Sequence, residues 1–172
     1  KTTAIIIQYV HSNISLVGDS AGANLSLVIA LKSLKETTRK PNCLVLNSIV
    51  SDFSGVLDRS IHKVNDFTVK DGFLDPLRKI YIGNEDYKNS EISPILGINS
   101  ELPPMFITCD YNETLYADSY NLYKKANELG IEVEFIEMKN TFHAFATTGI
   151  ATPETKKILE ESCDFIRKYS QK

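Results

Sequence analysis

The segment Gly18-Asp19-Ser20-Ala21-Gly22 constrains this chain more than any other. It stands between the apolar run at residues 14–17 and a stretch at residues 23–34 that we expect to be helical. A serine flanked by glycines at this spacing is typical of a sharp strand-to-helix turn, where side chains at the glycine positions would collide with the neighbouring elements. The turn places the serine hydroxyl at the helix N-terminus, which favours negative charge. The sequence therefore predicts that Ser20 is a nucleophile, the alternative being a simple helix cap.

A serine nucleophile needs a base, and the chain contains three histidines. His11 lies upstream of the serine, where a surface position is the simplest interpretation. His62 stands in the polar stretch at residues 59–63, which is typical of a solvated loop or helix face. His143 follows the alternating strand pattern at residues 132–138 after a short loop, from which it can reach Ser20. We therefore predict His143 as the base, the alternative being a half-buried histidine between two phenylalanines.

The remaining patterns alternate between strand and helix along the chain. We expect strands at residues 14–17, 43–50, 105–109 and 132–138, and helices at residues 23–34, 77–82, 118–129 and from 153 onward. Gly130 is a suitable helix end, and Thr152 with Pro153 a suitable helix start. Such alternation predicts an α/β fold, with a mostly parallel sheet and helices on both faces.

Composition excludes several classes of protein. The formal net charge is −3 and there is no basic stripe, which argues against a nucleic-acid partner. No apolar run approaches the roughly 20 residues of a membrane-spanning helix. A cytoplasmic location is favoured, but membrane association stays open because a targeting segment or anchor could precede Lys1.

The cysteines stand singly in apolar strand or helix positions, as Cys43, Cys109 and Cys163. Their spacing does not fit a metal site, and an odd number disfavours a disulfide framework. We expect all three to be reduced core residues.

Further motifs accompany the segment around Ser20. Asn24 follows it closely, Ser93-Pro94-Ile95 and Leu102-Pro103-Pro104 precede the strand at Met105, and His143-Ala144-Phe145 contains the predicted base. With these motifs nearly the whole chain resembles the hormone-sensitive-lipase-like branch of the α/β-hydrolases, which includes microbial carboxylesterases and acetyl esterases. The resemblance implies an α/β-hydrolase fold whose catalytic residues follow the chain order serine, acid, histidine.

The resemblance also indicates the acid, for which four carboxylates compete. Family members place it after the penultimate strand, as Asp-Pro-Leu or as Glu one residue before Leu, and Glu113-Thr114-Leu115 fits the second form. Asp110, closer to the strand end, is the runner-up. Asp118 fits the family's next acidic position and is expected to start or cap a helix. Asp75 stands in an Asp-Pro-Leu triplet but precedes the strand, so we interpret it as a decoy in the cap region.

The activity implied is a serine esterase that cleaves short-chain acyl esters through an acyl-enzyme, with the backbone amide of Ala21 in the oxyanion hole and no metal or organic cofactor. The alternatives are a lipase, a sterol-ester or amide hydrolase, and a non-catalytic binding or structural fragment of this fold. In the family the segment at about residues 51–99 borders the pocket. Its candidate pocket residues are Phe67, Phe73, Leu74 and Tyr81, unless these only pack against the sheet.

One departure from the family is clear. Its members carry an upstream His-Gly-Gly loop that supplies oxyanion amides, whereas none of the eight glycines here is adjacent to another. The serine strand also lies so close to Lys1 that we expect no room for earlier strands. We therefore interpret residues 1–172 as the C-terminal portion of an α/β-hydrolase catalytic domain. Its open sheet edge is expected to self-associate or to pair with a complementary N-terminal portion.

Overall fold

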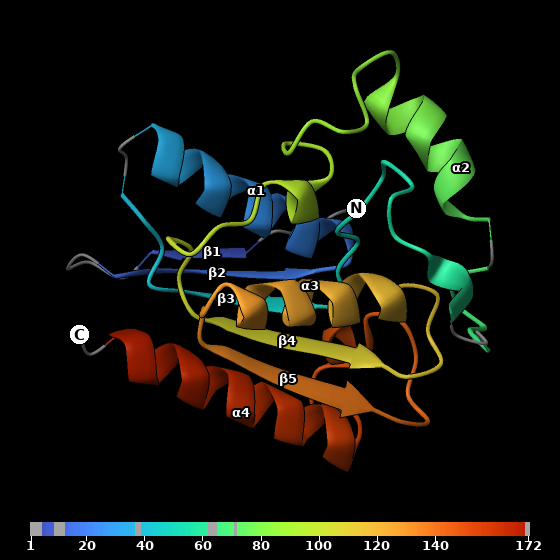
Figure 1. Ribbon diagram of the computed structural model, residues 1–172. Coiled ribbons are helices and arrows are strands. Elements are labelled where there is room, and N and C mark those ends of the chain that lie inside the picture. Colours follow the sequence, from blue (N-terminus) through green and yellow to red (C-terminus); the bar gives the residue numbers. More distant parts are fainter. Residues whose placement is uncertain (1–4, 9–12, 37–38, 62–64, 71, 171–172) are drawn as a thin grey trace.

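A computed structural model describes residues 5–8, 13–36, 39–61, 65–70 and 72–170. Its strands form one sheet in the order β1-β2-β3-β4-β5 (Figure 1). They are β1 (Ile5–Gln8), β2 (Ile14–Asp19), β3 (Cys43–Asn47), β4 (Met105–Asp110) and β5 (Val133–Met138). The strands β2 to β5 are parallel, and β1 is antiparallel to β2. The predicted α/β fold with a mostly parallel sheet is confirmed.

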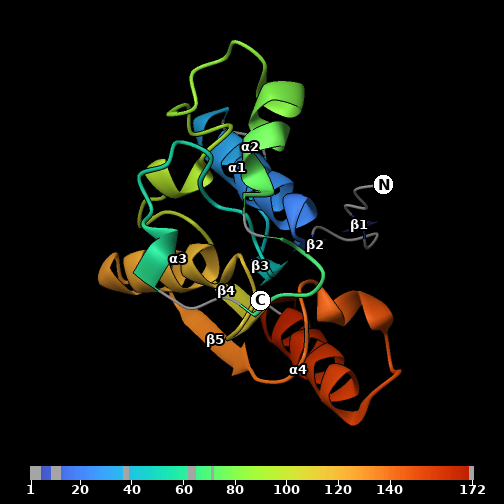
Figure 2. The ribbon, with the colours of Figure 1, turned by 90° about the vertical axis from the view of Figure 1, so that its right-hand side faces the viewer.

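Helices cover both faces of this sheet, as predicted. The longer helices are α1 (Ala21–Lys35), α3 (Tyr116–Glu128) and α4 (Pro153–Ser170). Helices α1 and α3 pack on one face and α4 on the other (Figures 1 and 2). Shorter helical turns are η1 (Arg59–Ile61), α2 (Leu74–Leu77), which continues into the π-helical turn η2 (Arg78–Ile82), η3 (Pro94–Leu96) and η4 (Phe145–Thr148). Within the described residues, no helix is both long and apolar enough to cross a membrane.

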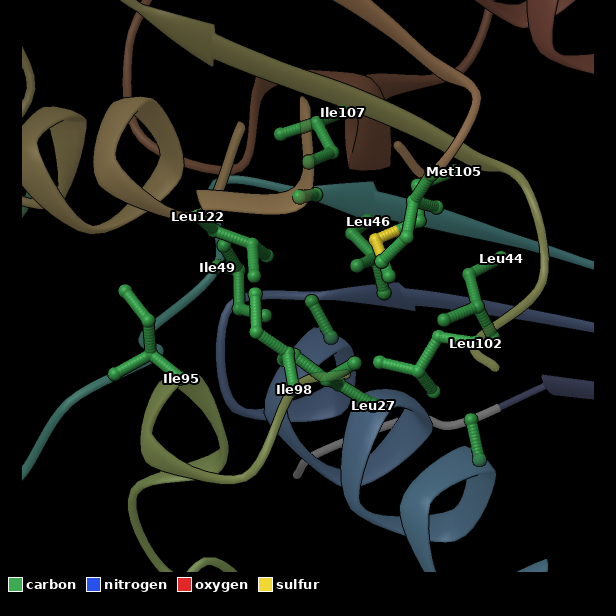
Figure 3. Close-up of a cluster of buried hydrophobic side chains, with 14 of the residues drawn as sticks. Leu27, Leu44, Leu46, Ile49, Ile95, Ile98, Leu102, Met105, Ile107 and Leu122 are labelled. Carbon is green, nitrogen blue, oxygen red and sulfur yellow. The ribbon is translucent and has the colours of Figure 1, made fainter. Parts of the chain in front are cut away.

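Alternate residues of β3 divide the core into two layers. Leu44 and Leu46 join the cluster beneath α1 and α3, which Figure 3 shows together with Met105 and Leu122. Cys43 and Val45 point to the opposite layer, beneath α4. A parallel strand with helices on both faces buries both sets of side chains, so β3 is apolar along most of its length. Burial of these side chains fixes the position of the strand ends on which the site depends.

Several expected boundaries differ from the structure. Strand β3 ends at Asn47, not Val50, because Ser48 adopts a φ of 47°, outside the strand region. Helix α3 begins at Tyr116, two residues before the expected start, while its end near Gly130, with φ of 74°, agrees with the prediction. Thr152 caps α4 as expected, because its hydroxyl accepts a hydrogen bond from the Thr155 amide.

Two further expectations were wrong. Cys163 lies on the exposed side of α4 and is not a core residue, whereas Cys43 and Cys109 are buried and all three thiols are free. The serine strand was expected to be an open edge, with no room for a strand before it. Instead β1 pairs with β2, with Ile5 opposite Val17 and Gln8 opposite Ile14.

Candidate active site

The turn around Ser20 has the strained geometry that the sequence predicts. Ser20 lies between the end of β2 and the start of α1, with φ of 54° and ψ of −116°. A Cβ atom added at Gly18 would lie 2.3 Å from the carbonyl carbon of Gly22, so only glycine fits at position 18. The Ser20 amide donates a hydrogen bond of 2.9 Å to the Asn47 carbonyl at the end of β3. The backbone of Ser20 is thereby fixed at the carboxyl ends of β2 and β3.

His143 meets this hydroxyl directly. Its Nε2 atom lies 2.9 Å from Ser20 Oγ, a normal hydrogen-bond distance. The histidine belongs to the loop between β5 and η4, and Asp110 anchors this loop. One carboxylate oxygen of Asp110 accepts hydrogen bonds of 2.7 Å from both the amide and the hydroxyl of Thr141. The structure therefore brings the predicted nucleophile and base together.

Glu113 stands behind the histidine. Its Oε1 atom lies 3.7 Å from His143 Nδ1, slightly longer than a hydrogen bond. Both atoms are buried and neither has a hydrogen-bond partner among the described residues. A small movement of either side chain would bring these two atoms within hydrogen-bond distance.

The second carboxylate oxygen of Glu113 is well held. It accepts a hydrogen bond of 2.8 Å from the Ser48 hydroxyl and a longer one, 3.3 Å, from the Asp110 amide. Burial raises the pKa of Glu113, and the His143 ring and the Ser48 hydroxyl oppose that rise. Glu113 is thus a buried carboxylate whose charged form is stabilised by the groups around it.

The other three carboxylates do not occupy this place. Asp110 serves the Thr141 anchor described above and accepts a further hydrogen bond from the Asn112 amide. Asp75 is exposed and pairs with Arg78 at 3.1 Å on the α2–η2 segment. Of the four candidates, Glu113 is the one that the structure places against His143.

Asp118 has a role that differs from the expected helix cap. It lies in the first turn of α3, but its fully buried carboxylate accepts hydrogen bonds from the Arg59 side chain, at 2.7 Å, and from the Ser51 and Asp52 amides. Burial raises the pKa of Asp118, and the Arg59 guanidinium opposes this. Asp118 therefore fixes the segment after β3 onto α3.

Among the described residues, every non-glycine residue with positive φ lies in this site. They are Ser20, Ser48, Asn140 and Ala144, with φ between 47° and 66°. Such conformations persist where surrounding contacts hold them, and they concentrate at functional sites. Sequence reasoning missed Ser48, because serine has no preference for positive φ and the run at residues 43–50 resembles one uninterrupted strand.

Of the four candidate pocket residues, Phe67 contacts the loop that carries His143. The residue is 75% exposed, and its ring lies 5.7 Å from that of Phe142, the neighbour of His143. Asp66 holds this position, because its carboxylate accepts a hydrogen bond from the Thr114 amide beside Glu113. An exposed Phe67 therefore packs against the half-buried Phe142 of the His143 loop.

The other three candidates differ in surroundings. Leu74 is buried in a separate small cluster with Val50, Phe53, Ile82 and Leu115, so it packs as a core residue. Phe73 and Tyr81 are exposed, and the Tyr81 ring lies 6.4 Å from that of Phe53.

Two predictions on histidines lie outside the described residues, namely those on His11 and His62. In the described part of the chain, no cluster of three or more His, Cys, Asp or Glu residues could hold a metal ion.

Comparison with known proteins gives consistent matches. A family model described as alpha/beta hydrolase fold matches residues 4–147. An acetyl-hydrolase of Streptomyces hygroscopicus is 28% identical over 90% of this chain and 52% of its own length. An esterase of Acinetobacter venetianus is 25% identical over 94% of this chain and 54% of its own. The chain therefore spans about half the length of the curated relatives it matches.

A solved structure agrees with these matches. The crystal structure of a hormone-sensitive lipase from a metagenome library superposes with a TM-score of 0.77 and 28% sequence identity. The match covers 88% of this chain and 52% of that protein.

Asp19, the residue before Ser20, is a second carboxylate beside the site. Burial raises its pKa to about 6, against lowering by a hydrogen bond with the Asn47 side chain and by the nearby His143. Its Oδ1 atom is buried without a hydrogen-bond partner among the described residues. The folded protein therefore holds the proton of Asp19 more tightly than the unfolded chain does, and ionised Asp19 destabilises the fold.

We expect Asp19→Asn to raise the free energy of unfolding at neutral pH, because it removes a buried charge and keeps a polar side chain. The folded pKa lies above the unfolded one, so the penalty is present above about pH 6 and vanishes below about pH 4. Urea denaturation of wild type and variant at about pH 4 and about pH 7.5 measures the difference. Asp164→Asn, on the exposed side of α4, is the control. An equal effect of Asp19→Asn at both pH values would contradict the prediction.

Proposed function

This chain belongs to the alpha/beta hydrolase family whose model it matches, and we propose that it acts as a serine hydrolase on carboxylic esters. The observation that carries the proposal is the 2.9 Å contact between Ser20 Oγ and His143 Nε2 on a strained strand-to-helix turn. A buried carboxylate, Glu113, faces the other ring nitrogen of the histidine. The same three side chains in this order can activate a serine for acyl transfer.

The geometry supports a two-step reaction. His143 Nε2 accepts the Ser20 proton while Oγ bonds to the ester carbonyl carbon, and the carbonyl electrons move onto its oxygen. Collapse of this intermediate breaks the bond to the alcohol, which leaves with the proton from His143. Water then attacks the acyl carbon and gives a proton to the same nitrogen. Collapse of this second intermediate breaks the bond to Ser20 Oγ, which takes the proton back from His143 as the acid leaves. Glu113 stabilises the charged imidazole in both steps.

The developing oxyanion needs backbone donors. The Ser20 amide already donates to Asn47, so it does not serve. Ala21 is the first residue of α1 and is exposed, and its amide lies where the helix N-terminus favours negative charge. We assign the oxyanion contact to this amide, in a position where one donor typically contributes about 10²–10³ in rate.

The substrate we propose is a small ester with a short acyl group. Two observations favour it: one relative is named an acetyl-hydrolase, and the rings of Phe67 and Phe142 lie 5.7 Å apart next to His143, where they can contact a small acyl group. A longer acyl chain would need a more extended apolar groove.

Ser20→Ala and His143→Ala should each remove nearly all p-nitrophenyl acetate hydrolysis and leave the unfolding transition almost unchanged. Because such residues act as a unit, the double variant should be little worse than either single one. Labelling of wild-type protein with a fluorophosphonate, followed by mass spectrometry, should modify Ser20. A loss below about tenfold in either variant would remove that residue from the mechanism. An unmodified Ser20 would favour a binding or structural role.

Glu113→Gln should lower turnover by several orders of magnitude, because the amide keeps the shape but cannot stabilise the charged histidine. Asp110→Asn is the matched control, since the Asp110 carboxylate is bonded to Thr141 and its amide contact with Glu113 is kept in the variant. Asp110→Asn should lower turnover much less, and Asp75→Asn should leave turnover almost unchanged. Steady-state kinetics on the purified variants measures this. If Asp110→Asn is the more severe change, the assignment of the acid to Glu113 is wrong.

Specificity for p-nitrophenyl acetate and butyrate should exceed that for the palmitate ester. The comparison of kcat/KM across the three esters measures this preference. Phe67→Ala tests whether the Phe67–Phe142 pair contributes to it. We expect that variant to weaken the preference without changing Ser20 labelling. Higher specificity for palmitate would point to a lipase or a sterol-ester hydrolase.

A further inference from the structure

Ser48 is a buried hydroxyl that the mechanism above does not use. It is the first residue after β3, has 0% exposure and adopts a φ of 47°. Its amide continues the strand pairing with a hydrogen bond of 2.7 Å to the Thr108 carbonyl. A buried serine keeps such a strained backbone only where contacts with its neighbours stabilise it.

Its hydroxyl links two parts of the site. Ser48 Oγ donates to Glu113 Oε2 at 2.8 Å and accepts a hydrogen bond of 3.0 Å from the Ala144 amide. Ala144 directly follows His143 and is itself strained, with φ of 58°. Hydrogen bonds in such a directed chain strengthen one another. One hydroxyl therefore binds the Glu113 carboxylate through Oε2, the oxygen that does not face His143, and also fixes the backbone at Ala144.

We propose that Ser48 is a positioning residue of the catalytic triad: its hydroxyl sets the orientation of Glu113 toward His143. The inference rests on the proposed serine hydrolase function. The other donor to Glu113 Oε2 is the Asp110 amide, at the longer distance of 3.3 Å. Without the Ser48 hydroxyl, Glu113 Oε2 keeps only this longer hydrogen bond among the described residues, and the Ala144 amide loses its partner.

Loss of this hydroxyl also changes the charge balance of the site. Burial raises the pKa of Glu113, and the hydrogen bond from Ser48 is one of the contacts that opposes the rise. Without that hydrogen bond the Glu113 carboxylate is protonated more easily, and a protonated Glu113 cannot stabilise a charged histidine. A residue that only filled space would not have this effect.

The test measures how fast a fluorophosphonate modifies Ser20, as a function of reagent concentration and pH. Ser48→Ala removes the hydroxyl and keeps a side chain, whereas Ser48→Gly removes the hydroxyl and also relieves the positive φ. Ser33→Ala is the matched control, because Ser33 is a buried serine with a single hydrogen bond inside α1. The final extent of labelling reports the folded fraction, so loss of fold is separated from loss of rate.

We expect both Ser48 variants to react about tenfold or more slowly at saturating reagent, with an unchanged half-saturating concentration and final extent. The acidic limb of their rate profile should move to higher pH, and Ser33→Ala should resemble wild type. Wild-type rates in both variants would overturn the inference. So would a rate loss in Ser48→Ala that Ser48→Gly restores, since strain and not the hydroxyl would then be responsible.

A second measurement separates this inference from the proposed function. If wild-type Ser20 is not labelled, the serine hydrolase proposal fails, and an NMR titration of the His143 ring still tests the role of Ser48. A titration midpoint that both Ser48 variants shift and Ser33→Ala leaves in place supports the positioning role. Equal midpoints in all four proteins overturn it.

Discussion

The parallel pairing of β2, β3, β4 and β5 is the constraint on which the site depends. Each important side chain follows the carboxyl end of a different strand: Ser20 follows β2, Ser48 follows β3, Glu113 follows β4 and His143 follows β5. Backbone hydrogen bonds continue the register past the strand ends, from Ser20 to Asn47 and from Ser48 to Thr108. In open α/β sheets this edge is where ligands bind, because the loops from neighbouring strands converge there. Sheet geometry thus determines the distances between the site residues.

The strain in the site depends on the packing beneath it. Four non-glycine residues with positive φ lie within the site, and each conformation of this kind costs on the order of 1–3 kcal/mol. The two apolar layers on either side of β3 and β4 supply the stabilisation that offsets this cost. Two buried polar contacts also fix the segments around the site: Asp110 binds Thr141 in the His143 loop, and Arg59 pairs with Asp118. The core and the site are therefore parts of one arrangement, in which a rigid sheet keeps unfavourable turns in place.

Much of this arrangement could be predicted from sequence, for identifiable reasons. Ser20 has a local signal, because only glycine fits at position 18. His143 could be selected because few histidines compete and one follows the last strand pattern. Glu113 depended on the family resemblance, since nothing local distinguishes it from Asp110. Ser48 and the anchoring role of Asp110 had no signal, because both arise from contacts between residues far apart in the chain. The exposure of Cys163 was missed for a similar reason, since only packing decides which side of α4 faces the sheet.

The sequence separation of paired strands also affects how the chain folds. Strand β3 pairs with β4 across the long segment at residues 48–104, so closing this pair requires contacts between distant parts of the chain. Such contacts are slow to form because a large loop must close first. The Ser20 hydroxyl reaches His143 only when β2, β3, β4 and β5 are all in register. Under the proposed function, the reactivity of Ser20 is therefore a reporter of the completed sheet, and partly folded forms of the chain carry an ordinary, unreactive hydroxyl.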